Sequence, residues 1–276
     1  SEVLRLDDDH KIYWMDHPIA YLEKGKNYLN PKLKLLVDEA IDLDCKDKLQ
    51  KNLEKKLYTL ISSKLSDLVN LSKSNFKNNY VRALCFQLFE NNGVMKRETI
   101  HKMIKSITKE DRANLRKAGV KIGRYHIFLP KMLKPSAVEL RVKLWKLYFH
   151  EDKKYIIPKY GLNFLKNETK NNSKFLLICG FENFDKFYVR VDILERFFLK
   201  IIENTKDKSF KINSDMINLI GCSKENFFKL LELMEYKSKN KKEEFFIYKP
   251  KLIKNKKVEK TGKNNPFEKL SELRFR

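Results

Sequence analysis

The chain has 276 residues, 42% of them hydrophobic and 34% charged, which is enough apolar sequence to bury a sizeable core. It contains no run of the roughly 18–20 apolar residues that a membrane span needs, no start of the secretory type and no CxxC pair among its four cysteines, so we expect a cytoplasmic protein with reduced thiols and no membrane partner. The net charge of +23 predicts a polyanionic partner, because lysine and arginine contacts to phosphates release counterions.

The first forty residues are expected to be extended. Short apolar runs in VLRLDDDHKIYWMDHPIAYL (3–22) flank the turn-like DDDH and predict a β-hairpin. KLKLLVD (32–38) is either a third strand or the start of a helix. The range 1–40 is therefore interpreted as a short β-hairpin with an extended opening segment. Because the chain starts with Ser1 rather than methionine, a fragment of a longer protein is the simplest interpretation, although removal of the initiator methionine gives the same start.

Helical periodicity takes over after residue 43. Apolar residues at steps of three and four predict helices over 44–68, 81–89 and 100–107. Thr108 and Asp111 have the spacing of a capping box and begin a fourth helix, which Gly119 ends. Together with the helix that follows residue 135, these elements predict a helical, bundle-like domain over 41–150.

The segment GVKIGRYHIFLPKMLKP (119–135) interrupts the helical pattern with two glycines and two prolines. VKIG and YHIFLP are expected to be extended. Ser136 and Glu139 predict a capping box for a helix that ends near Phe149. His126 stands in a strongly apolar context, and we interpret it as a structural histidine rather than a general base.

The second half of the chain has a different organisation. Residues 151–180 are polar and rich in Pro, Gly and Asn, so they are expected to form a linker. Residues 181–250 show the order of a winged helix: helix, short strand, helix, turn, helix and a hairpin wing at 236–250. The basic stretch 251–276 is expected to be a tail whose last residues, NPFEKLSELRFR, dock on a partner surface. The predicted fold class is mainly α: a helical bundle-like domain followed by a winged-helix-like domain with a small β-hairpin wing.

Catalytic machinery is not recognisable in the sequence. The chain lacks a Gly-rich loop ending in Gly-Lys-Ser/Thr, a G-x-G-x-x-G turn and a DExH box, so we expect it to hydrolyse no ATP. It also lacks a G-x-S-x-G elbow and a cluster of His, Cys and carboxylate residues at ligand spacing. We therefore predict no catalytic residue, no metal site and no cofactor.

Two groups of residues are candidates for nucleic-acid binding. Arg124 and Tyr125, with Lys131 nearby, could grip a single strand by charge and stacking, although an arginine packed over the rim of a core is at least as common. The second group lies on the third helix and the wing of the winged-helix region: Lys229, Lys237, Lys239, Lys241 and Lys242. A solvated turn explains the wing lysines equally well. Only 11 of the 59 basic residues are arginine, a composition typical of an AT-rich genome. An arginine is therefore stronger evidence of nucleic-acid binding than a lysine.

The outward face of the helix at 223–236 argues against sequence-specific reading of DNA. It carries Glu225, Lys229 and Glu232, a mixture of charges without amide side chains. Base edges in the major groove are read mainly by Arg, Lys, Asn and Gln. Contacts to backbone phosphates are therefore the expected mode of binding, and a sequence-specific regulator is the less favoured interpretation.

KAGVKIGRYHIFLPKMLKPSAVELRVKLW (117–145) resembles a signature in the C-terminal region of alphaproteobacterial helicase-related proteins. These are superfamily-two helicases akin to the ATP-dependent RNA and DNA helicase of the mitochondrial degradosome. The similarity continues in the same order through four further segments, at 3–25, 82–95, 217–236 and 265–276. The two RecA-like motor domains of that family, with its ATP and magnesium sites, have no counterpart in this chain, so no catalytic residue is carried over.

The resemblance implies a C-terminal accessory region of an ATP-dependent helicase. Such a region would bind or guide RNA or DNA, expected to be single-stranded, mainly through backbone contacts, next to helicase motor domains in cis. ATP and magnesium would be needed only by those motor domains. The alternative is a protein-interaction scaffold that docks onto the motor or onto another subunit.

Overall fold

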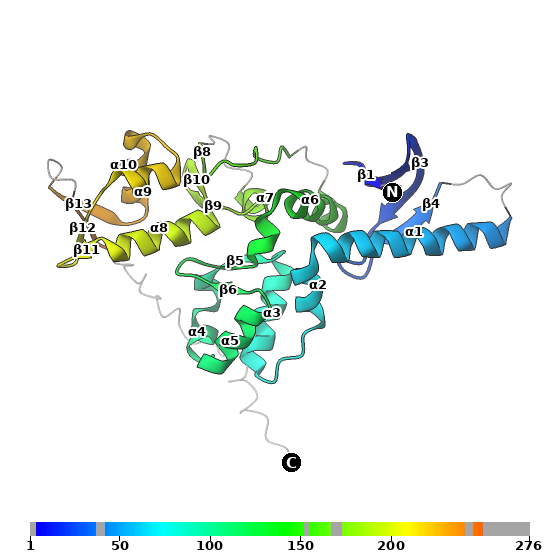
Figure 1. Cartoon of the computed structure of the whole chain (residues 1–276), viewed down its shortest axis with the longest axis horizontal. Coiled ribbons are helices and arrows are strands. Elements are labelled where there is room, and N and C mark those ends of the chain that lie inside the picture. Colours follow the sequence, from blue (N-terminus) through cyan, green and yellow to red (C-terminus); the bar gives the residue numbers. More distant parts are fainter. Residues whose placement is uncertain (1–3, 37–41, 152–154, 167–172, 241–244, 251–276) are drawn as a thin grey trace, which may run out of the picture.

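A computed structural model of the chain describes residues 4–36, 42–151, 155–166, 173–240 and 245–250. The expected tail at 251–276 and two of the wing lysines, Lys241 and Lys242, lie outside the described residues. Figure 1 shows an elongated molecule. The described residues up to 64 form one end, those from 191 onward form the other, and the other described residues lie between them.

Over the described residues the fold is mixed α/β, with about 50% helix, 21% strand and four small antiparallel sheets. The expected class, mainly α with a single hairpin wing, is therefore wrong. Most of the strands are two to four residues long. Strands of that length are too short to show the alternation of polar and apolar residues by which a strand is recognised in a sequence.

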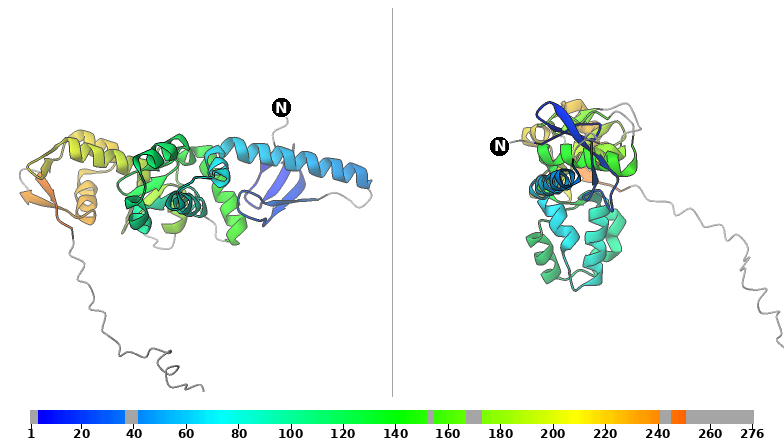
Figure 2. Two further views of the ribbon diagram at one scale, coloured as in Figure 1. Left: turned by 90° about the horizontal axis from the view of Figure 1, so that it is seen from below. Right: turned by 90° about the vertical axis from the view of Figure 1, so that its right-hand side faces the viewer.

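Residues 5–35 form a four-stranded antiparallel sheet, which includes the expected hairpin across the DDDH turn and, at 32–35, the strand considered for KLKLLVD. Its strands are adjacent in chain order: β1 (Arg5–Leu6), β2 (Lys11–Trp14), β3 (His17–Glu23) and β4 (Lys32–Leu35). Alternate apolar residues share one face of a strand, and those of this sheet are buried: Ile12, Ala20, Leu22 and Leu33. The long helix α1 (Leu43–Lys64) packs along this sheet (Figure 2).

The helical region follows the expected order with one break. The helix expected up to residue 68 ends at Lys64, and Leu65, with a φ of −115°, joins it to the next helix. The further elements are α2 (Ser66–Lys73), α3 (Asn79–Glu90), the 3-10 helix η1 (Arg97–Ile100), α4 (His101–Lys105) and α5 (Lys109–Lys117). The capping box of α5 is confirmed, because Thr108 and Asp111 exchange side-chain to backbone hydrogen bonds of 3.1 Å in both directions. Within the described residues, no helix combines the length and apolarity of a membrane span.

The segment 119–135 contributes two strands to a second sheet. β7 (His126–Phe128) is its central strand and pairs with β5 (Val94–Lys96) and β6 (Lys121–Ile122). The 3-10 helix η2 (Pro130–Leu133) then leads into α6 (Pro135–Phe149). The predicted capping box at Ser136 is wrong. Pro135 occupies the first turn, where its missing N–H costs nothing, and Lys134 precedes it without a side-chain cap.

The range 151–180 is not only a linker. It contains β8 (Phe164–Lys166) and α7 (Ser173–Ile178), and β8 joins the hairpin of β9 (Phe181–Phe184) and β10 (Phe187–Arg190) in a three-stranded sheet. Phe175 and Leu176 of α7 are buried in a cluster with Trp145 of α6. The described part of this range therefore connects the two halves of the molecule through packed side chains.

The C-terminal unit has the order of elements expected for a winged helix, but its wing belongs to a larger sheet. The elements are α8 (Val191–Glu203), β11 (Thr205–Lys206), β12 (Ser209–Lys211), α9 (Ser214–Ile220), α10 (Lys224–Leu233), β13 (Tyr236–Asn240) and β14 (Phe245–Tyr248). The strands pair in the order β11-β12-β14-β13, which leaves β13 at an edge. Phe227, Leu230 and Leu231 of α10 face the core of this unit, as the helical pattern predicted.

Candidate nucleic-acid interface

The turn at residues 123–126 connects β6 to β7 and is fixed by Arg97. The backbone N–H of Gly123 donates to the carbonyl of His126 at 2.8 Å, which closes the turn. Arg97 of η1 donates from its guanidinium to the carbonyl of Gly123 at 2.7 Å and from its backbone N–H to the carbonyl of Tyr125 at 2.8 Å. Arg97, which lies 26 residues before Gly123 in the chain, therefore holds this turn in one conformation.

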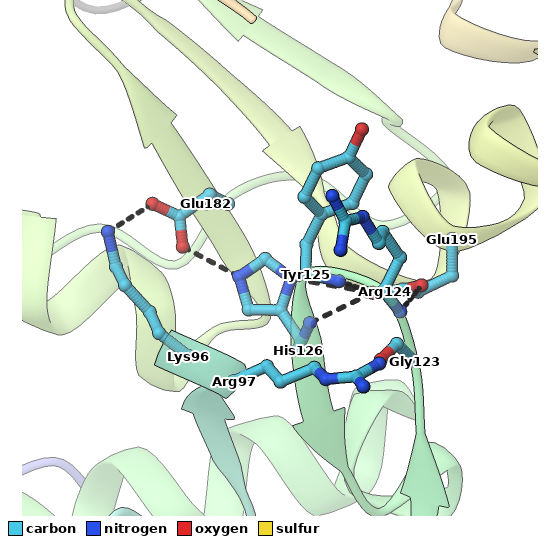
Figure 3. A network of polar contacts seen from close by, with 8 residues as sticks. All are labelled: Lys96, Arg97, Gly123, Arg124, Tyr125, His126, Glu182 and Glu195. Carbon is cyan, nitrogen blue, oxygen red and sulfur yellow. Dashed lines mark hydrogen bonds and ion pairs between the residues drawn. The ribbon is translucent and has the colours of Figure 1, made fainter. Parts of the chain in front are cut away.

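The same turn binds the carboxylate of Glu195, which lies on α8 (Figure 3). The backbone N–H groups of Arg124, Tyr125 and His126 donate to its two oxygens at 2.5, 2.8 and 2.9 Å. Glu195 is 4% exposed, so these bonds replace the water that a carboxylate otherwise needs. The turn is thereby attached to the first helix of the C-terminal unit.

Gly123 is required by this arrangement. A Cβ atom at position 123 would lie 2.2 Å from the carboxylate carbon of Glu195, far closer than atoms can approach. Only a residue without a side chain lets the backbone come this near to α8.

A second buried carboxylate lies beside the turn. Glu182 of β9 accepts a hydrogen bond of 2.7 Å from Nε2 of His126 and forms an ion pair of 2.6 Å with Lys96 (Figure 3). Burial alone would raise the pKa of Glu182, but the hydrogen bonds and charges of His126 and Lys96 outweigh it, and the pKa lies below its ordinary value. His126 is 1% exposed and is held by this contact, which fits a structural histidine.

Two open depressions adjoin the turn. The first, which we call the basic depression, has a volume of about 350 Å³. It is lined by Lys96, Arg97, His101 and Arg124, together with the carboxylates of Glu98 and Glu182. The second, which we call the aromatic depression, has a volume of about 420 Å³ and is lined mainly by Tyr125, Phe184, Phe198, Tyr236 and Tyr248 with aliphatic neighbours. Arg124 and Tyr125 line both depressions, as do Glu98, Phe184 and Tyr248. We call Arg124 and Tyr125, which stand on the fixed turn, the ridge.

Arg124 and Tyr125 differ in exposure. The Arg124 side chain is exposed, with its guanidinium carbon 5.7 Å from the ring centre of Phe198. Tyr125 packs edge-on against Phe198, and its hydroxyl lies 3.4 Å from that of Tyr236. Burial raises the pKa of Tyr125, so its hydroxyl stays protonated. Tyr125 therefore packs the ridge against the C-terminal unit, and Arg124 is the side chain of the ridge that is exposed to solvent.

The remaining predicted residues divide into two sets. Lys131 pairs with the buried carboxylate of Asp67 at 2.8 Å, and Lys229 pairs with Glu225 at 2.5 Å, so neither presents an uncompensated charge. That both bind nucleic acid stays a prediction, and each ammonium is already paired with a carboxylate. Lys237 and Lys239 are exposed on the edge strand β13. Lys237 directly follows Tyr236, which touches the ridge.

Several lining residues were missed from the sequence. Lys96 and Arg97 of the basic depression lie in a strand and a turn that the sequence pattern did not predict. Arg97 carried one usable signal, because arginine is scarce in this chain. Phe184 and Tyr248 sit near the ends of hairpin strands and resemble ordinary core aromatics in the sequence.

No protein-family model, no curated protein and no solved structure matches this chain. Within the described residues, no three His, Cys, Asp or Glu side chains converge as metal ligands. The arrangement of cations and exposed rings around a fixed turn is the feature from which a function is best inferred.

Proposed function

We propose that this chain is an accessory region of an ATP-dependent nucleic-acid helicase and that it holds or guides an RNA or DNA strand at the ridge formed by Arg124 and Tyr125. The observation that carries the proposal is the exposed Arg124 guanidinium on a turn whose backbone is fixed by Arg97 and Glu195. A rigid turn presents its cation at little entropic cost. The net charge of +23 and the resemblance to helicase C-terminal regions support the same function.

Arg124 is the strongest phosphate-binding candidate in the basic depression. Lys96 is half exposed, but its ammonium already compensates Glu182. Arg97 is partly buried and bonded to the carbonyl of Gly123. Arg124 forms no ion pair within the described residues and lies at the boundary of both depressions. Arginine also matches phosphate geometry with two parallel donors.

Binding of a labelled single-stranded oligonucleotide, measured by fluorescence anisotropy over a salt series, tests this function. The wild-type chain should bind at low salt and lose affinity steeply as salt rises. Arg124→Gln should weaken binding and reduce the slope of log K against log salt by about 1. Arg116→Gln removes the same charge from an exposed position on α5 and is the matched control. Failure of the wild-type chain to bind at low salt would refute the proposal.

A protein-docking function is favoured by one other surface. The tip of the β2–β3 hairpin exposes Trp14 at 43% and Met15 at 75%, and Leu36, exposed at 47%, is bonded to Ile19 at the same end of the sheet. Exposed large apolar side chains that lie together mark interaction sites. A nuclease-resistant pull-down of purified motor domains that is lost in Trp14→Ser/Met15→Ser, but retained in Leu43→Ser, would support this second candidate. Retention of the pull-down in the double variant would exclude this tip as the docking site.

A further inference from the structure

The aromatic depression is an apolar surface that no contact within the described residues covers. Tyr248 is 49% exposed, Ile202 53% and Leu233 42%, and all three line it. Phe184 and Phe198 complete its walls from β9 and α8. A contiguous hollow of exposed rings and aliphatic side chains is typical of a ligand site rather than of a solvated face.

The charges around this depression select the part of a nucleotide that fits. Two carboxylates, Glu98 and Glu235, line it, against a single lysine, Lys208, apart from the shared Arg124. A phosphate inside it would therefore gain little. Across the ridge, the basic depression has three cations, Lys96, Arg97 and Arg124, against the carboxylates of Glu98 and Glu182, and it is the side that better suits a phosphate. An uncharged, flat ring is the part of a nucleotide that matches the aromatic side.

Tyr248 is oriented to receive such a ring. Its hydroxyl donates to the carboxylate of Glu235 at 3.2 Å, and its ring lies 5.4 Å from that of Tyr236, tilted by 57°. These contacts hold the ring in place while half of its surface stays open to solvent. A ring that is fixed before binding loses little conformational freedom when a base stacks on it.

We propose that the aromatic depression takes one unstacked nucleobase, which lies against Tyr248 while the neighbouring phosphate is held by Arg124. This inference rests on the proposed strand binding and adds its substrate class. Bases in a duplex are stacked and paired, and removing one from the stack costs several kcal/mol. The site therefore selects single strands over duplexes.

Three probes of equal length test the inference with the whole chain: a mixed-sequence single strand, the corresponding duplex and a fully abasic strand. Wild type should bind the single strand about tenfold more tightly than the abasic strand, because stacking on one aromatic ring contributes about that factor. Tyr248→Ala should lose this advantage, with affinity for the abasic strand, affinity for the duplex and the salt slope unchanged. Tyr248→Phe keeps the ring and should stay within about threefold of wild type.

The outcomes separate this inference from the function on which it rests. If wild type binds the abasic strand as tightly as the normal strand, base insertion is wrong, and phosphate binding at Arg124 stands. The same conclusion follows if Tyr248→Ala weakens the single strand and the duplex equally. If wild type binds none of the probes at low salt, both proposals fail. The abasic comparison uses only the wild-type protein, so it remains decisive even if Tyr248→Ala does not fold.

Discussion

The carboxylate of Glu195 lies 2.8 Å from the backbone nitrogen of Tyr125, although 70 residues separate the two in the chain. Two further backbone N–H groups, of Arg124 and His126, donate to the same carboxylate. This contact joins the turn that carries the proposed binding arginine to the C-terminal unit that supplies most of the aromatic depression. The relative position of the two depressions therefore depends on Glu195.

Glu195→Gln should destabilise the protein by about 2–4 kcal/mol. The amide that replaces the carboxylate has one acceptor oxygen, and its NH2 group faces N–H donors, so at least one buried donor is left unsatisfied. Urea unfolding followed by circular dichroism measures the change. Glu225→Gln on the exposed face of α10 is the control and should leave the midpoint unchanged. A small effect of Glu195→Gln would show that water replaces the carboxylate easily.

Gly123→Ala should destabilise the protein by about 1–3 kcal/mol, because its Cβ would overlap the carboxylate of Glu195. The cost should be smaller in a Glu195→Ala background, where the carboxylate is gone. A double-mutant cycle on unfolding free energies measures this coupling. Additive effects of the two substitutions would mean that the clash is relieved by another route.

Local signals in the sequence identified several elements correctly. The first helix of the order expected over 181–250 is α8, and the capping pair Thr108 and Asp111 starts α5 as predicted. Both depend on residues three or four apart, whose spacing is visible in the sequence. The segments VKIG and YHIFLP, which were expected to be extended, contain β6 and β7. Their partner β5 was missed, because it has three residues and pairs with β7 across about thirty positions.

The candidate site was predicted only in part, because some of its residues have local signals in the sequence and others depend on long-range contacts. Arg124 and Tyr125 stood out because arginine is scarce and the turn contains Gly123. Glu182 and Glu195 were not identified, since their partners lie more than fifty residues away in the sequence. The pairing of Lys229 with Glu225 was visible from their spacing of four. The pairing of Lys131 with Asp67 was not, because it depends on the tertiary fold.

Stability should depend on the protonation of Glu182 in acid. Its pKa is lowered in the folded protein from an ordinary 4.5, with Lys96 and His126 as the groups that face it. Its carboxylate therefore stabilises the fold fully above about pH 4.5, and this contribution is lost as the pH falls through the folded pKa. The free energy of unfolding in urea should fall more steeply with decreasing pH below 4.5 for wild type than for Glu182→Gln. Equal slopes would mean that the carboxylate is not ionised in the fold.

The lysines of the C-terminal unit should not contribute equally to strand binding. Lys237→Gln/Lys239→Gln removes two exposed charges from the edge strand β13 and should reduce the salt slope by up to about 2. Lys229→Gln and Lys131→Gln should change it far less, because each of these lysines is already paired with a carboxylate. Anisotropy titrations at several salt concentrations distinguish the two sets. A larger effect of Lys229→Gln would place the strand on α10 and away from the ridge.

Arg141 should be the most sensitive position in the core. It is fully buried on α6, and its guanidinium donates to the carbonyls of Asn92, Met132 and Ile178. Burial lowers its pKa to about 10, so it remains charged at neutral pH. Arg141→Met would leave three buried acceptors without this donor and should cost about 3 kcal/mol or more in unfolding free energy. Arg196→Met on the exposed face of α8 is the control. A near-neutral Arg141→Met would show that the apolar side chain repacks and the three carbonyls find other donors.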